Sequence, residues 1–362
     1  MILLAPYGAM LADRFPRRIT VAVVYSAFAV LAGLLGVLVL TGLVQMWHIV
    51  FVALIVGLIC TVEIPVRVVF LSEIVPAVDL QNAISVYAIV FWFGGVAGPL
   101  VSGPMITEVG AAWLILFYAV ACALVAVTIA LLRVSELQVI PPVALGRPPF
   151  RETLLYARAK PTILWPLVLI ACFAVFVLPN GVALSGMAQS VFQSGPSGPG
   201  LYSAMLAVGA LLGALASTRV QALRLRTVML AAATFASLQL LSGLMPVEVA
   251  FVVLMTGVGC TRLIYEVSSG SLVQLSSNSR MRGRVVSLYN MPVAVGISIG
   301  GLLMGTLTEL WGAQDAIVVT AAVPLLATLV IAGFLSGKPS LLRVFRIGSG
   351  RSLLGSVTRE PE

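Results

Sequence analysis

Long apolar segments recur along the whole chain, separated mostly by short polar turns. Leu, Val, Ala and Ile dominate them, without the alternation of polar and apolar residues typical of a transmembrane β-strand. Most approach the roughly twenty residues that a helix needs to cross a bilayer core of about 30 Å. The pattern therefore predicts an all-α membrane protein. The eleven predicted segments are Met1–Ala12, 19–42, 47–70, 82–106, 111–132, 163–186, 200–218, 227–244, 247–270, 285–309 and 313–335.

One connection is longer than the others and divides the chain near its middle. It contains two Pro-Pro pairs, followed by a stretch from Arg151 to Lys160 in which basic and apolar residues are mixed. Such a stretch is typical of a short amphipathic helix on a membrane surface. We therefore expect four parts: an N-terminal bundle at 1–132, a cytoplasmic linker at 133–162, a C-terminal bundle at 163–335 and a cytoplasmic tail at 336–362.

The composition excludes a soluble domain. Hydrophobic residues make up 60% of the chain and charged residues 9%, with a mean hydropathy of +1.11, whereas a soluble domain carries about 25% charged residues. The net charge of +8 does not indicate nucleic-acid binding, because all but two of the 21 Lys and Arg residues lie in alternate turns or in the tail. This positive-inside pattern predicts that these turns and the C-terminus are cytoplasmic, in a plasma (inner) membrane.

Residues that bind metals or carry catalysis are few and scattered. The four cysteines lie far apart inside apolar segments, and the single histidine, His48, lies near a predicted helix start. We therefore expect no metal site and no cofactor. The run from Gly333 to Pro339 does not have the spacing of a P-loop. No catalytic motif is recognisable, so the sequence does not favour an enzyme, and no ATPase domain is apparent.

The chain repeats itself after a shift of 202 residues. The repeat predicts two pseudo-symmetric halves of like fold, as in many transporters, with one helix fewer in the first half. The residues that align without a gap are Gly57/Gly259, Ser85/Ser287, Tyr87/Tyr289, Gly94/Gly296, Gly98/Gly300, Leu100/Leu302, Gly103/Gly305, Gly110/Gly312 and Ala111/Ala313.

Several motifs resemble those of the major facilitator superfamily. They are the loop Gly8-Ala-Met-Leu-Ala-Asp13-Arg14-Phe-Pro-Arg17-Arg18, the stretches Pro65-Val-Arg67, Leu71-Ser-Glu73 and Leu80-Gln-Asn82-Ala83, the glycine run Gly94-Gly95-x-x-Gly98-Pro99-x-x-x-Gly103, and Gln274 with Arg282-Gly283-Arg284-Val285. In this order they are similar to the drug- and siderophore-efflux branch, which includes enterobactin exporters and macrolide efflux pumps. The resemblance implies twelve helices, of which helix 1 is missing here and helix 2 is partial. We expect either a mis-assigned start or a fragment.

The resemblance also implies roles for two of these motifs. The loop, here called the latch cluster (Gly8, Asp13, Arg14, Arg17 and Arg18), latches the two halves at the cytoplasmic side in the family. Plain positive-inside topology is the alternative reading, although topology alone requires no Asp. The glycine run (Gly94, Gly98, Pro99 and Gly103) is associated with antiporters in the family. Glycines at this spacing also allow close helix packing in any membrane protein, so both readings stay open.

Two charge pairs lie inside apolar segments. Glu63 and Arg67 are four residues apart, as are Arg262 and Glu266, so each pair shares a helix face. Both pairs are expected near cytoplasmic helix ends, with either a structural or gating role or a role in handling substrate or protons. Pro179-Asn180-Gly181 interrupts another segment, and Asn180 is a candidate for lining the substrate path or for a simple kink.

These features predict a monomeric secondary transporter that exports small molecules, drug-like or siderophore-like, by alternating access and proton antiport. Its partners are a small-molecule substrate, the lipid bilayer and protons. The visible acids are poorly placed for proton coupling, because Glu108 and Glu309 lie at outer helix ends and Glu63 and Glu266 each have a nearby Arg. We therefore expect the coupling acid on the missing helix 1. The alternatives are a truncated, inactive relic, and an intramembrane enzyme or scaffold.

Overall fold

The computed structural model describes residues 16–75, 79–133, 150–217, 222–336 and 345–346. The chain divides into two compact units, Met1–Gly146 and Arg147–Glu362. In the described residues, eight helices are long and apolar enough to cross a membrane. The expected all-α membrane fold is therefore confirmed.

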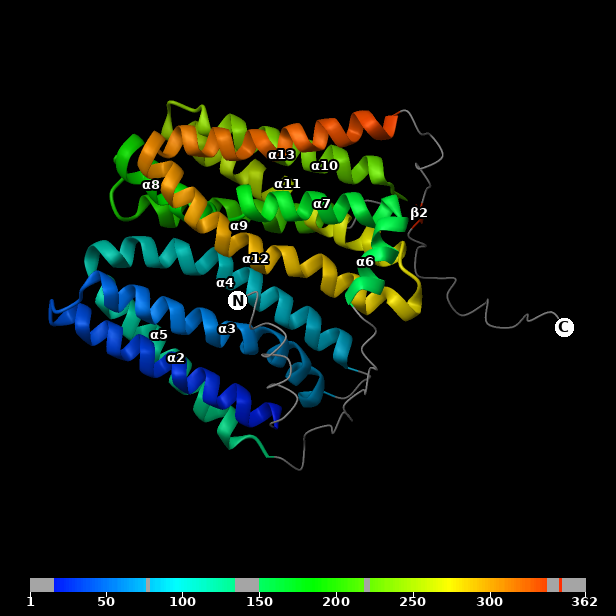
Figure 1. Cartoon of the computed structure of the whole chain (residues 1–362). Coiled ribbons are helices and arrows are strands. Elements are labelled where there is room, and N and C mark those ends of the chain that lie inside the picture. Colours follow the sequence, from blue (N-terminus) through cyan, green and yellow to red (C-terminus); the bar gives the residue numbers. More distant parts are fainter. Residues whose placement is uncertain (1–15, 76–78, 134–149, 218–221, 337–344, 347–362) are drawn as a thin grey trace. The chain divides into compact units, whose positions relative to one another are not determined.

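Unit 1 contains four long helices in its described part. They are α2 (Arg17–Leu40), α3 (Met46–Ile74), α4 (Leu80–Glu108) and α5 (Ala111–Leu131). Helices α2 and α5 pack side by side (Figure 1). Their close approach depends on Gly36, because an added Cβ would lie 2.7 Å from a methyl carbon of Leu116. Gly42, just after α2, has a φ of 71°, which glycine adopts without steric cost and which lets the chain turn back.

The single histidine helps to begin α3. His48 occupies the third position of the helix, and its Nδ1 accepts a hydrogen bond of 3.0 Å from the backbone N–H of Gln45. The Gln45 side chain in turn accepts from the His48 backbone, which completes a reciprocal capping arrangement. The histidine therefore has a structural role at a helix start.

Unit 2 contains a short helix, six membrane-length segments and a small ladder in its described part. Its elements are α6 (Phe150–Ala159), α7 (Pro161–Phe176), α8 (Asn180–Gly186), the π-helical turn η2 (Met187–Val191), α9 (Gly198–Ser217), β1 (Ala222–Leu223), α10 (Leu225–Gly243), α11 (Glu248–Leu275), α12 (Ser279–Trp311), α13 (Ala313–Ser336) and β2 (Phe345–Arg346). The two-residue strands β1 and β2 pair antiparallel. This small ladder does not change the all-α class.

The helix interruption predicted at Pro179 is present in unit 2. Helix α7 ends at Phe176, and α8 begins at Asn180. Pro179 cannot donate a backbone hydrogen bond, and the chain bridges the gap with a tight contact from Asn180 N–H to the carbonyl of Leu178, 2.9 Å long. The segments α7, α8 and η2 still form one continuous apolar span, Pro161–Val191.

Glycines set how closely α9 and α11 approach. A Cβ added to Gly209 of α9 would lie 2.0 Å from the carbonyl oxygen of Thr256, and one added to Gly259 of α11 would lie 1.9 Å from that of Leu206. Each helix therefore places a glycine against the other's backbone, the packing that small residues permit between membrane helices. The outer helices α10 and α13 pack against each other.

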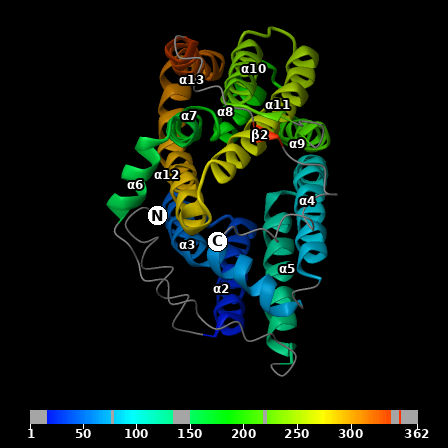
Figure 2. The same ribbon diagram turned by 90° about the vertical axis from the view of Figure 1, so that its right-hand side faces the viewer.

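The predicted amphipathic helix is α6. It runs across the ends of α7 and α12 and lies outside them, as Figure 2 shows. The ammonium of Lys160 donates to the hydroxyl of Tyr156 at 2.7 Å and to the carbonyl of Ser276 at 3.1 Å. The same hydroxyl accepts from the backbone N–H of Asn278 at 3.0 Å. Burial acts to raise the pKa of Tyr156, but the bonds from Lys160 and Asn278 outweigh it, so the pKa lies below its usual value. The start of unit 2 is thus tied to the turn between α11 and α12.

Several helices run further than hydropathy predicts. Helix α3 continues to Ile74 and α11 to Leu275, past the expected ends at residues 70 and 270. Helix α12 begins at Ser279, so the arginines at 282 and 284 lie in its first turns and not in a loop. Polar residues lower the mean hydropathy of a segment but do not end its helix, because the backbone hydrogen bonds of the helix continue outside the hydrocarbon. The two charge pairs consequently lie about two to three and a half turns inside these helix ends, deeper than expected.

Candidate substrate cavity and polar clusters

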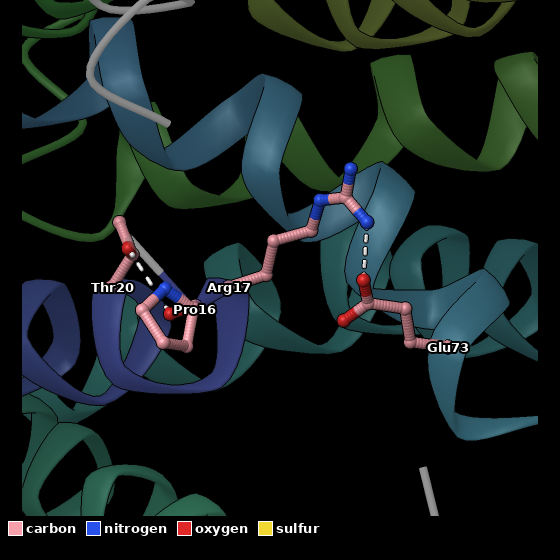
Figure 3. A network of polar contacts seen from close by, with 4 residues as sticks. All are labelled: Pro16, Arg17, Thr20 and Glu73. Atoms are coloured by element: carbon pink, nitrogen blue, oxygen red, sulfur yellow. Dashed lines mark hydrogen bonds and ion pairs between the residues drawn. The ribbon is translucent and has the colours of Figure 1, made fainter. Parts of the chain in front are cut away.

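The arginines at the start of α2 contact the ends of two neighbouring helices in unit 1. Figure 3 shows the guanidinium of Arg17 pointing at the carboxylate of Glu73, with which it forms an ion pair. Arg18 donates from Nε to the carbonyl of Ile129 at 2.9 Å, and from its terminal nitrogen to the carbonyl of Ala130. These carbonyls lie at the C-terminal end of α5, where the helix dipole favours a cation. The two arginines therefore hold the start of α2 against the ends of α3 and α5.

The rest of the predicted latch cluster lies outside the described residues. Gly8, Asp13 and Arg14 all precede residue 16, where the described part of the chain begins. The contacts of Arg17 and Arg18 are within unit 1. A latch between the two halves stays a prediction.

The charge pair of unit 1 is enclosed by helices. Glu63 is 7% exposed, and its carboxylate pairs with Arg67 Nε at 3.1 Å. The hydroxyl of Tyr25 donates to the same carboxylate at 3.3 Å, and the Arg67 guanidinium lies 5.6 Å from the ring centroid of Tyr87. Helices α2 and α4 thus each place a tyrosine beside this ion pair of α3. A buried carboxylate is tolerated when it is paired and hydrogen-bonded in this way, so the arrangement supports a structural role.

The charge pair of unit 2 lines an open cavity of about 360 Å³. Helices α7, α11 and α12 supply its wall. The apolar part of the wall comes from Ile170, Leu178, Val273, Val286, Val293 and Ile297. Its polar part comes from Arg262, Glu266, Gln274, Tyr289 and Asn290. An apolar cavity with a few converging polar groups is the usual form of a small-molecule site.

The ion pair in this cavity uses only part of the hydrogen-bonding groups of Arg262 and Glu266. Arg262 Nε donates to one carboxylate oxygen of Glu266 at 2.9 Å. The side chains remain 28% and 31% exposed, respectively. A guanidinium has five N–H donors and a carboxylate has two oxygens, so a single hydrogen bond leaves donors and an acceptor available to a ligand.

Two neighbouring polar residues of α12 complete the wall. Tyr289 is 8% exposed, and its hydroxyl is buried. Asn290, the next residue, is exposed, and its side-chain amide can both donate and accept hydrogen bonds. Together with the ion pair, Asn290 equips the cavity to hydrogen-bond a guest.

Unit 1 contains a larger cavity of a different chemical character. It measures about 470 Å³, and its wall includes Phe28, Leu35, Val52 and Ile106. No charged residue is among its described lining residues, and the lining hydroxyl of Ser102 already donates to the carbonyl of Pro99. It offers apolar contact but few groups that recognise a specific substrate, so the unit 2 cavity is the better candidate site.

Asn180 is buried rather than open to the candidate cavity. The residue is 4% exposed, and neither atom of its side-chain amide has a hydrogen-bond partner among the described residues. It is not among the residues that line the cavity of about 360 Å³, although its neighbour Leu178 is. Its role in the substrate path stays a prediction.

The predicted packing glycines of α4 have no close neighbour in the described residues. A Cβ added to Gly94 or Gly98 would meet no atom within 4 Å. Their repeat counterparts on α12 behave differently: Gly296 and Gly300 lie against α7, and a Cβ added to Gly300 would be 2.0 Å from the carbonyl oxygen of Val175. The equivalent glycines are thus packed in unit 2 and open in the described part of unit 1. Of the other two residues in this motif, Gly103 is buried and Pro99 is partly buried within α4.

Two polar residues of the cavity, Tyr289 and Asn290, were not predicted as site residues. The sequence did indicate the wall formed by α11, because Arg262, Glu266 and Gln274 lie at intervals of four and eight residues on one face of that helix. No such periodicity identifies the facing wall of α12. The remaining acids at helix ends, Glu108 and Glu309, are exposed, as their positions predicted.

Comparisons with known proteins agree with this architecture. The sequence pattern of the Major Facilitator Superfamily matches residues 1–291. A bacterial homologue of the human lysosomal transporter Spinster, in an inward-facing and unoccupied conformation, is 17% identical with a TM-score of 0.68, over 92% of this chain and 87% of that chain. The nucleoside transporter NupG is 14% identical with a TM-score of 0.66, over 92% and 87%. At these identities the structures show a shared fold only. No curated protein matches the sequence.

Proposed function

The chain belongs to the Major Facilitator Superfamily and is therefore a secondary transporter rather than an enzyme, and we propose that it exports small organic molecules by alternating access. The observation that carries this proposal is the cavity of unit 2, in which Arg262, Glu266 and Asn290 face an apolar wall. Such a site can hold a small molecule by its polar groups while shielding its apolar part from water.

The sequence motifs are the basis for the proposed direction of transport and for its proposed energy source. The motifs resemble the drug- and siderophore-efflux branch, and the glycine run of α4 resembles the antiporter motif of that branch. Protons moving inward are the proposed driving ion. The basic turns follow the positive-inside pattern, so we propose that the C-terminus is cytoplasmic and that the protein lies in the plasma (inner) membrane. We further propose that the protein acts as a monomer and that the latch cluster holds the halves together on the cytoplasmic side.

Inside-out membrane vesicles test this function directly. With the vesicle lumen acidified, we expect uptake of a radiolabelled macrolide or a radiolabelled catecholate siderophore, and loss of uptake when a protonophore collapses the gradient. Vesicles without the protein give the background. A C-terminal tag should be removed by protease added outside these vesicles, because their cytoplasmic face is exposed. Uptake no greater than background for both compounds contradicts export of drug-like and siderophore-like molecules, and a protected tag contradicts the orientation.

A further inference from the structure

We infer that the cavity of unit 2 selects small zwitterions, molecules that carry one cationic and one anionic group on an apolar body. This inference rests on the proposed function, because it assigns the substrate class of the same cavity. Arg262 and Glu266 are the only charged residues among its described lining. They are bound to each other, so the cavity has no net charge to offer.

Charge balance favours a guest without net charge. A cation would approach a carboxylate already neutralised by Arg262, and an anion would approach a guanidinium already neutralised by Glu266. Either guest would leave one unbalanced charge in a partly desolvated site, which is unfavourable where the effective dielectric constant is low. A zwitterion keeps the sum of charges at zero.

The unused bonding positions favour a zwitterion over an uncharged guest. The single bond between Arg262 Nε and a Glu266 oxygen leaves the terminal nitrogens of Arg262 without a hydrogen bond in the described residues. A carboxylate matches the planar fork of those nitrogens, and an ammonium matches the free side of the Glu266 carboxylate. The two ends of a zwitterion can thus be bound without separating the pair.

The rest of the wall fits the body of such a molecule. Ile170, Val293 and Ile297 provide apolar contact from α7 and α12. The exposed side-chain amide of Asn290 lies on the same wall and can donate to, or accept from, the polar end of the guest. A purely apolar molecule would form no hydrogen bond with this amide or with the ion pair.

The unit 1 pair provides a matched comparison inside the same protein. Glu63 and Arg67 have the same four-residue spacing as the cavity pair, but Glu63 is 7% exposed and already accepts from Tyr25. Neither residue lines the cavity of unit 2. A charge change at Glu63 should therefore leave ligand selectivity unchanged.

Binding of four phenylalanine derivatives to the purified full chain tests the inference. They are phenylalanine itself (zwitterion), phenethylamine (cation), N-acetylphenylalanine (anion) and N-acetylphenylalanine amide (uncharged). We expect phenylalanine to bind the unmodified protein about tenfold more tightly than the other three. Glu266→Gln should make the anion the tightest ligand, because the guanidinium becomes unbalanced. Arg262→Gln should make the cation the tightest, and Glu63→Gln should keep the original order.

Exchange of the two charges is a second variant that keeps the net charge at zero. The double variant Arg262→Glu with Glu266→Arg should still prefer phenylalanine, so the inference stays testable if a single variant does not fold. Equal binding of all four compounds, no binding of phenylalanine, or an unchanged order in both single variants overturns the zwitterion inference. Because binding is measured without transport, the expected order together with no gradient-driven uptake of radiolabelled phenylalanine into the vesicles supports this inference and contradicts the proposed export.

Discussion

Gly300→Ala is expected to destabilise the protein strongly, whereas the equivalent change Gly98→Ala is expected to leave it as stable or slightly more stable. The added methyl carbon at Gly300 would lie 2.0 Å from the carbonyl oxygen of Val175 and 2.6 Å from a ring carbon of Pro179. Backbone cannot move aside as a flexible side chain can, so α7 and α12 must separate. Overpacking of this kind costs about 3 kcal/mol.

Gly98 is the matched control because it holds the equivalent position in the repeat. The added methyl group there meets no described atom within 4 Å, and alanine favours a helix interior by about 1 kcal/mol relative to glycine. The melting temperatures of the two purified variants in detergent measure the difference. A loss of stability in Gly98→Ala as large as that in Gly300→Ala would show that the repeat positions are packed alike.

Arg67→Ala and Arg262→Ala are expected to separate folding from transport. Among the described residues, removing Arg67 leaves the Glu63 carboxylate, 7% exposed, with only the Tyr25 hydroxyl as partner. An uncompensated buried charge of this kind costs about 3 kcal/mol or more. Removing Arg262 leaves Glu266, whose side chain is 31% exposed to the cavity and can be hydrated. We therefore expect Arg67→Ala to lower the melting temperature and Arg262→Ala to retain it.

The transport rate should respond in the opposite way, falling more in Arg262→Ala than in folded Arg67→Ala. Arg262→Ala is expected to reduce uptake into inside-out vesicles about tenfold or more, because the cavity loses the cation that orients its ligand. The fraction of Arg67→Ala that folds should transport at a rate close to that of the unmodified protein. If Arg262→Ala transports normally, or if Arg67→Ala melts like the unmodified protein, the division of roles between the two pairs is wrong.

The sequence predicted the helices well because apolar length is a direct requirement of the bilayer. The interruption at Pro179 and the short helix before Lys160 were also predictable, since a proline lacks a donor and a mixed basic stretch cannot span hydrocarbon. Helix ends were less predictable. Hydropathy falls where a helix leaves the membrane, but the helix itself continues, as α12 does from Ser279.

The candidate site was only partly predictable. Spacing along one helix placed Glu63 with Arg67 and Arg262 with Glu266, but it gave both pairs the same expected role. Their difference arises from lateral neighbours: Tyr25 and Tyr87 surround the first pair, whereas a cavity opens beside the second. Packing between distant segments decides such neighbours, and no local pattern records it. The same holds for the glycines of α4 and α12, which are alike in sequence and different in surroundings.

Chemical modification of one cavity residue tests most directly the central claim that substrate passes through the cavity of unit 2. Asn290→Cys, placed in a variant whose four native cysteines are replaced, puts a thiol on the cavity wall. Ser287→Cys is the control, because Ser287 is exposed on the same helix and does not line the cavity. Inside-out vesicles are treated with a bulky, membrane-impermeant maleimide, and uptake of the labelled compounds is measured. We predict that modification abolishes uptake by Asn290→Cys and spares that by Ser287→Cys. Full uptake by completely modified Asn290→Cys would contradict the account.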